Sequence, residues 1–288
     1  MTGPVVPYLQ QHLTTLGGST HATCTDILYN GVDTYLAGST SDGDTSTASM
    51  LVNLPISGTQ RRHTISRCNG RIDSYDPVFD AGAQRCRAEI VGPSHIPQGQ
   101  TQYIIGARMI EAPANGASNF SPNNWRNHMQ GHHASSAPAN PVWALGIDSG
   151  GKAGETLWTR WAGPDNVQND NPYITLPPVV YWSFRYFYME ILPNWQGNAV
   201  FKLYTRELYD TDWTLRADLG GANFKLGYAS NDGSNFGVNL QNGVYMGIPQ
   251  GGDNTVVWWA NVEQTTDAAY AQSLFNDPIP VFMTPVSA

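Results

Sequence analysis

Strand-like runs recur between residues 48 and 264 of this chain, and turn-forming pairs separate them. The candidate strands are 49–54, 62–67, 85–91, 101–110, 142–148, 173–176, 180–191, 199–208, 213–217, 224–228, 236–240, 243–248 and 255–263. The expected turns are Asn69-Gly70, Asp232-Gly233, Asn242-Gly243 and Gly251-Gly252. So many short strands predict an all-β fold, either a sandwich or a jelly roll.

One segment has a helical pattern, and it lies near the end of the chain. It covers residues 266–275, with Thr266 or Asp267 as the N-cap and Asn276, Asp277 and Pro278 as the stop. We therefore divide the chain into three parts. Residues 1–47 form a polar arm or attachment segment, 48–264 a β domain, and 265–288 a short helix with a proline-rich tail. The alternative for the first part is that it supplies edge strands to the β domain.

The composition fits a β protein with a real core and excludes some functions. Hydrophobic residues make up 41% of the 288 residues, while Asp, Glu, Lys and Arg make up only 13%. The net charge of -8 argues against a general nucleic-acid binder, which needs a basic face. No apolar run approaches the length of a membrane span, so we expect no membrane insertion.

The stretch 84–90 concentrates charge on one face of a predicted strand. Small or apolar residues at 86, 88 and 90 alternate with Arg85, Arg87 and Glu89. Because side chains alternate between the two faces of a strand, the three charges share one face. Such a cluster indicates either a packed ion-pair network or a site for a charged ligand. Arg85 is expected near the strand end and exposed.

The cysteines and the acidic loops indicate no cofactor. Of the three cysteines, Cys68 and Cys86 could bridge neighbouring strands or remain free thiols. Oxygen ligands at Asp42, Asp44 and 165–171 could suit a structural Ca²⁺, but ordinary turn chemistry explains them better. His128 and His132 have a metal-ligand spacing only in a helix, and Gly131 disfavours a helix there.

Several motifs arrive in an order that resembles a known family. They are an Arg-x-Glu strand in 80–90, the strand 96–103, a Gln-x-His strand in 125–133, its successor 141–145, a Gly-Val-Tyr strand in 243–247, and a closing strand 256–262. This order resembles jelly-roll polysaccharide lyases of the heparin lyase I-like and glucuronan lyase-like groups, and more distantly alginate lyases. The resemblance implies a β-jelly roll, a concanavalin-like sandwich of two antiparallel sheets.

The resemblance also implies a β-elimination site for uronic-acid polymers. Arg87 and Gln130 would neutralise the sugar carboxylate, His132 would be the base, and Tyr245 would be the acid or a sugar contact. Further substrate contacts would come from four polar residues: Glu89, Asn239, Gln241 and His128. The plainer alternatives are that Arg87 is locked to Glu89 as a structural pair and that His132 is only a hydrogen-bonded polar residue.

The chain departs from the family pattern at Asn239. In alginate-lyase-like relatives a catalytic tyrosine lies six residues before the final tyrosine, which is Tyr245 here. An amide cannot donate a proton as a phenol does, so Tyr245 or Tyr228 would have to substitute. A second sugar-binding possibility is a platform of tryptophans, although core packing is the default for each. These residues are Trp158, Trp161, Trp182 and Trp195.

The sequence therefore supports three hypotheses. The first is a protein that binds, and cleaves by β-elimination, an acidic or host-surface polysaccharide. The second is a non-catalytic glycan-binding phage virion protein, in a tail or capsid decoration, that forms a homo-oligomer or assembles through residues 1–47. The third is a β protein whose likeness stops at the fold. We see no signal peptide, which predicts a virion or extracellular location for a phage protein and a cytoplasmic one otherwise.

Overall fold

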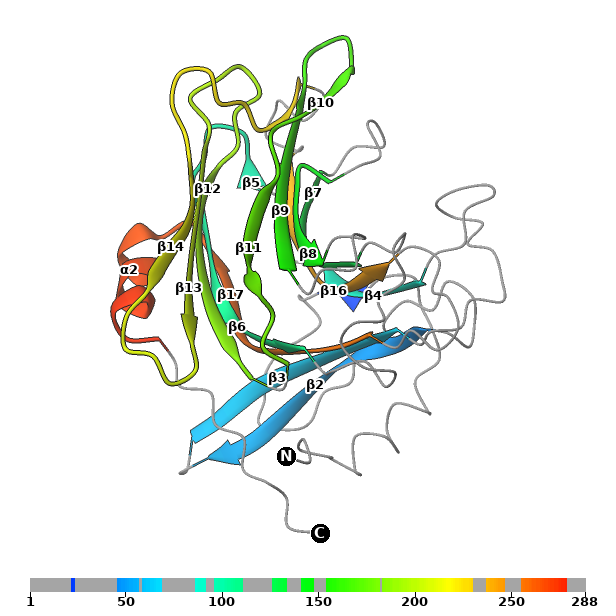
Figure 1. Cartoon of the computed structure of the whole chain (residues 1–288), viewed down its shortest axis with the longest axis vertical. Helices are drawn as coiled ribbons and strands as arrows, with labels where there is room; N and C mark the ends of the chain where they lie inside the picture. The colour runs from blue at the N-terminus through cyan, green and yellow to red at the C-terminus, as the bar shows by residue number, and fades with distance from the viewer. Residues whose placement is uncertain are drawn as a thin grey trace.

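The computed structural model of the chain describes the strands of two sheets and one helix (Figure 1). The residues it describes are 22–23, 46–56, 59–68, 86–91, 96–110, 126–133, 141–147, 154–181, 183–229, 237–246 and 255–278. Several expectations lie outside these residues: Arg85, Trp182, the aspartates at 42 and 44, three of the four predicted turns, and nearly all of residues 1–45.

The described strands form two packed sheets, and most neighbours are antiparallel. The ten-stranded sheet contains β1 (Ala22–Thr23), β4 (Cys86–Val91), β16 (Gly237–Met246), β7 (Arg126–His133), β8 (Trp143–Ile147), β9 (Gly154–Ala162) and β10 (Gln168–Asp170) in that order, with β5 (Ile96–Pro97) on β16 and β11 (Ile174–Pro178) and β15 (Gly227–Tyr228) on β9. The seven-stranded sheet has the order β14 (Thr214–Leu219), β13 (Val200–Glu207), β12 (Arg185–Leu192), β6 (Gln102–Ile110), β17 (Thr255–Thr265), β3 (Thr59–Cys68) and β2 (Ser46–Ile56). The predicted all-β jelly roll of two antiparallel sheets is confirmed.

The core lies between the two sheets, where alternate residues of each strand meet. Trp143 of β8 is fully buried and contacts Phe201 of β13 edge to face, with ring centroids 5.6 Å apart. Such aromatic contacts add to the large apolar area that each ring buries. Gly131 of β7 makes room for the indole, because a Cβ there would lie 2.0 Å from Trp143 Nε1. Only glycine permits this approach.

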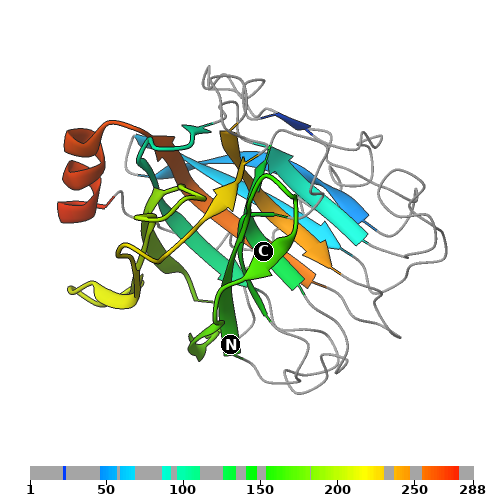
Figure 2. The same cartoon turned by 90° about the horizontal axis from the view of Figure 1, so that it is seen from above.

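The predicted helix is present as α2 (Ala268–Asn276), and its N-cap is Asp267. One Asp267 carboxylate oxygen accepts hydrogen bonds from the N–H groups of Ala269 and Tyr270, at 2.9 and 3.0 Å. Figures 1 and 2 show α2 on the side of the seven-stranded sheet that faces away from the other sheet. No helix among the described residues is long and apolar enough to cross a membrane.

Three expectations about elements differ from the structure. β16 runs unbroken through the predicted turn at Asn242-Gly243, with a register shift against β7 instead. β9 was not predicted, because Glu155 occupies a buried position that a sequence pattern would assign to an apolar residue. Cys68 lies in β3 and Cys86 in β4, which belong to different sheets, so a bridge between them would join the two sheets and not hydrogen-bonded neighbouring strands; whether they pair stays a prediction.

Candidate functional site

The predicted site residues fall on three adjacent strands, β4, β16 and β7. We call the face of the ten-stranded sheet that points away from the seven-stranded sheet the outer face. Met129 and Leu240 lie in the core between the sheets. Their neighbours along the chain are Gln130 on β7 and position 239 on β16; the Gln130 side chain takes the outer face, because successive strand residues alternate.

The register across β16 aligns the predicted positions in rows. On the β7 side, position 239 pairs with His132 and position 241 with Gln130. On the β4 side, position 245 pairs with Arg87 and position 243 with Glu89, with no shift between them. Residues directly opposite each other in an antiparallel pair are about 4.5–5.5 Å apart and share a face. The backbone thus brings the four predicted catalytic positions together on neighbouring strands.

The row through Gln130 continues onto β8 and β9. Gln130 pairs with Ala144, and Ala144 pairs with Trp158. Gln130 is fully buried, whereas the side chains of His132 and Trp158 are half-buried. The Arg160 guanidinium lies over the Trp158 ring, 4.1 Å from its centroid, and forms an ion pair with Asp170. Sequence reasoning missed Arg160, although its alternation with Trp158 was a usable signal.

His128 lies where β7 shifts register against β8, and it is 1% exposed. Burial lowers the pKa of His128 well below its usual value, and the nearby Arg108 and Arg126 lower it further. Neither ring nitrogen has a hydrogen-bond partner among the described residues. His128 is therefore a neutral imidazole at pH 7, and its predicted substrate contact stays a prediction.

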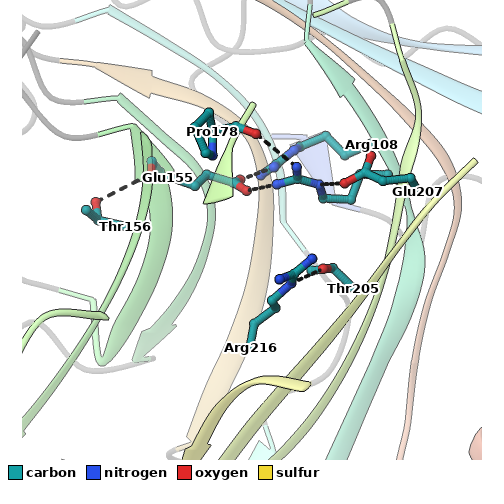
Figure 3. Close-up of polar contacts among 9 residues, drawn as sticks. Arg108, Glu155, Thr156, Pro178, Thr205, Glu207 and Arg216 are labelled. Atoms are coloured by element: carbon teal, nitrogen blue, oxygen red, sulfur yellow. Dashed lines mark hydrogen bonds and ion pairs between the residues drawn. The ribbon is translucent and has the colours of Figure 1, made fainter. Parts of the chain in front are cut away.

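A buried ion network joins the two sheets (Figure 3). Glu155 of β9 forms ion pairs with Arg108 of β6 and with Arg185 of β12, the second at 3.0 Å. Arg185 also pairs with Glu207 at 2.6 Å and donates a hydrogen bond to the Pro178 carbonyl at 3.0 Å. Glu155 is 1% exposed and Arg108 is 5% exposed. Because unpaired buried charges are very costly, this network fixes the relative position of the sheets.

The charge of Arg108 in this network adds to burial in keeping His128 neutral. Burial, and then repulsion by Arg185, lowers the pKa of Arg108 to about 9, while Glu207 raises it. Arg108 therefore remains charged at neutral pH and keeps its ion pair with Glu155. A second positive charge on His128 would be repelled by this arginine.

Tyr228 cannot replace the missing acid, contrary to the alternative drawn from the sequence. Its side chain is fully buried in the core, and its hydroxyl donates a hydrogen bond to the Pro141 carbonyl at 3.1 Å. Burial raises the pKa of Tyr228. A core phenol with a raised pKa and an internal partner does not reach a polymer. Tyr245 remains the candidate.

Two other groups of sequence candidates have structural partners. Trp161 lies beneath Lys225, whose Nζ is 4.2 Å from the ring centroid. Asp165 accepts a hydrogen bond from the Val167 N–H at 3.2 Å, which is the turn chemistry that Asp residues favour. Among the described residues, no group of three or more His, Cys, Asp or Glu side chains is arranged to hold a metal ion.

Comparisons with solved structures identify the fold. The structure is similar to an endo-β-1,4-glucuronan lyase from the fungus Trichoderma reesei, with a TM-score of 0.52 and 12% identity over 83% of this chain and 92% of the other. A family 7 alginate lyase A1-II′ with bound substrate gives a TM-score of 0.44 and 8% identity, over 70% and 77%. A PL-14 alginate lyase from Aplysia kurodai gives a TM-score of 0.40 and 8% identity, over 75% of this chain and 87% of the other.

The two alginate lyase scores are below 0.5, so the fold assignment rests on the glucuronan lyase. No family model matches the sequence, and no curated protein is similar to it. The order of strands, the two-sheet sandwich and the structural similarity agree with one another. The chain has the jelly-roll fold of polysaccharide lyases.

Proposed function

We propose that the protein binds a uronic-acid polysaccharide on the outer face of the ten-stranded sheet and cleaves it by β-elimination. The register of β4, β16 and β7 carries this proposal. It aligns position 245 with Arg87, and positions 241 and 239 with Gln130 and His132. Arginine, glutamine, histidine and tyrosine at these aligned positions supply the guanidinium, amide, imidazole and phenol groups that this elimination needs.

In the proposed reaction, each group has one task. Arg87 and Gln130 hold the sugar carboxylate, which stabilises the negative charge that develops when the neighbouring carbon loses its proton. His132 accepts that proton from C5. The electron pair forms the C4–C5 double bond as the C4–O bond breaks, and Tyr245 donates a proton to the leaving oxygen. Half-burial of His132 is compatible with contact to both the polymer and the sheet.

A second candidate is glycan binding without turnover, and Asn239 favours it. Position 239 pairs directly with His132. An amide at this position forms hydrogen bonds with sugar hydroxyls but cannot supply a proton at neutral pH. The phage virion role is a separate prediction that neither the fold nor the register tests.

Incubation with glucuronan and with alginate tests the proposal. We expect ultraviolet absorbance from an unsaturated product, and we expect His132→Ala to lower kcat about 100-fold or more, the usual contribution of a general base. His133→Ala is the matched control, because the same residue type lies one position along β7. Affinity electrophoresis on the same polymers separates the two candidates: retardation without product supports binding alone. Neither retardation nor product would refute both.

A further inference from the structure

A cleft of about 360 Å³ lies on the opposite side of the molecule from the candidate lyase site. Its lining residues lie on β13, in the segment just before β14 and at the end of α2. Figure 1 shows these elements close together, with α2 on the outward side of the seven-stranded sheet. The lining residues that matter here are Tyr204, Arg206, Asp212, Trp213, Phe275 and Asn276. Its volume is at the small end of the range for ligand pockets, about 300–1,000 Å³.

The guanidinium of Arg206 is held in place by two aromatic rings. Arg206 pairs with Tyr186 across β12 and β13, and its Cζ is 4.8 Å from that ring centroid and 5.4 Å from the Trp213 centroid. Cation–π contacts of this kind stabilise the charge without using the guanidinium's N–H groups. Among the described residues, the buried Nε of the Arg206 side chain has no hydrogen-bond acceptor. A fixed cation with an unused donor is prepared for a ligand.

The aromatic wall of the cleft is also rigid. Trp213 stacks on Phe275 with an interplanar angle of 11° and a centroid distance of 5.0 Å. The indole Nε1 donates a hydrogen bond to the Phe275 carbonyl at 2.8 Å, which links the segment just before β14 to the end of α2. Tyr204 meets Phe275 edge to face at 5.3 Å. These contacts exist without a ligand, so the cleft is preformed and binding need not order it.

A carboxylate and an amide lie at the rim of the cleft, near the Arg206 guanidinium. Asp212 and Asn276 are exposed, and both line the cleft beside Arg206. A carboxylate accepts hydrogen bonds, a guanidinium donates them, and an amide does both. This set does not match a simple anion, because Asp212 would repel it. It does match adjacent sugar hydroxyls, each of which both donates and accepts.

We propose that this cleft is a second, non-catalytic saccharide-binding site, which takes a pyranose unit through its hydroxyls. Asp212 accepts from the hydroxyls, Arg206 donates to them, and the sugar's C–H face packs on the aromatic wall beside Tyr204. The site goes beyond the proposed lyase function and does not depend on turnover. On a protein that acts on a long polymer, such a site holds a second segment of the polymer, on the opposite side of the molecule from the proposed lyase site.

Fluorine NMR of the whole protein labelled with 5-fluorotryptophan tests this site locally. The Trp213→Phe variant identifies the Trp213 resonance. The probes are a glucuronan hexamer and the neutral cellohexaose, and the His132→Ala background slows any cleavage. We expect at least one of the two oligosaccharides to shift the Trp213 resonance, and we expect this shift to saturate as the oligosaccharide concentration is raised. We expect Asp212→Ala to weaken the apparent Kd about tenfold or more, the usual loss for one hydrogen bond to a charged group.

Asp218→Asn is the control, because Asp218 is an exposed acid in the nearby strand β14 that does not line the cleft. Its Kd should equal that of the parent. Arg206→Lys, which keeps the charge but loses the planar fork, should also weaken binding. The proposal would be overturned if neither probe shifted the Trp213 resonance. It would also be overturned if the probes shifted this resonance with the same apparent Kd in the Asp212 and Arg206 variants as in the parent. Absence of lyase turnover would leave this result unaffected and would count only against the proposed function.

Discussion

At the scale of single residues, burial and charge decide which groups are available for chemistry. Glu155 is 1% exposed and joins two arginines, whereas Asp170, whose carboxylate pairs with Arg160, is 45% exposed. The ion pairs of Glu155 are shielded from water, whereas the ion pair of Asp170 is not. Replacing each of these two acids with its amide should therefore lower the free energy of unfolding by different amounts.

Replacing Glu155 with Gln should destabilise the protein by about 3–5 kcal/mol, because it leaves buried arginine charge without its partner. Asp170→Asn is the control, and it should cost about 1 kcal/mol or less, since exposed ion pairs contribute little. Urea unfolding followed by fluorescence measures both. Equal losses in the two variants would show that the inter-sheet network is not shielded as described.

His128 should make stability depend on pH. Its pKa in the folded state lies well below the usual value of about 6.5, so the unfolded chain binds more protons as the pH falls. The free energy of unfolding should therefore decrease as the pH drops below about 6.5, until the folded state also takes up the proton. His128→Asn should make this decrease smaller. An unchanged pH dependence in this variant would mean that His128 is charged in the folded protein.

At the scale of elements, the sequence predicted most strands and the helix but not all of their boundaries. Alternation and capping were sufficient for β4 and α2, because local chemistry determines both. The same reasoning divided β16 at Asn242-Gly243, although pairing with β4 on one side and β7 on the other keeps that strand continuous. β9 was missed because Glu155 is buried through partners on β6 and β12, which no local pattern contains.

For the candidate site too, the sequence predicted the individual residues but not how the fold aligns them. The motifs were sufficient to propose positions 87, 130, 132 and 245, because each motif is a short strand segment. Their alignment depends on β16 lying between β4 and β7, which sequence order does not reveal. The exclusion of Tyr228 also needed the fold, since its hydrogen bond to Pro141 spans 87 positions.

Helix α2 should depend on its N-cap. Asp267→Ala removes the acceptor for two backbone N–H groups and should cost about 0.5–2 kcal/mol. The loss should appear in hydrogen exchange as faster exchange in 268–276 than in the strands. Gln272→Ala, an exposed change in the same helix, should leave that exchange nearly unchanged. Similar exchange in both variants would contradict a capping role for Asp267.

At the scale of the whole molecule, two sheets present two different surfaces. The outer face of the ten-stranded sheet carries the aligned positions of the proposed lyase site, and the other sheet carries the aromatic cleft beside α2. The core and the buried ion network lie between them. A polymer that occupies both surfaces must pass around an edge of the sandwich, so long chains should bind more tightly than hexamers.

The central claim is that the outer face across β4, β16 and β7 holds a uronic-acid polymer. The most direct test is a crystal structure of the His132→Ala variant with a glucuronan hexamer. We predict a sugar carboxylate in contact with Arg87 and Gln130, and a glycosidic oxygen near Tyr245. A fully occupied hexamer that lies elsewhere and leaves this face empty would contradict the account.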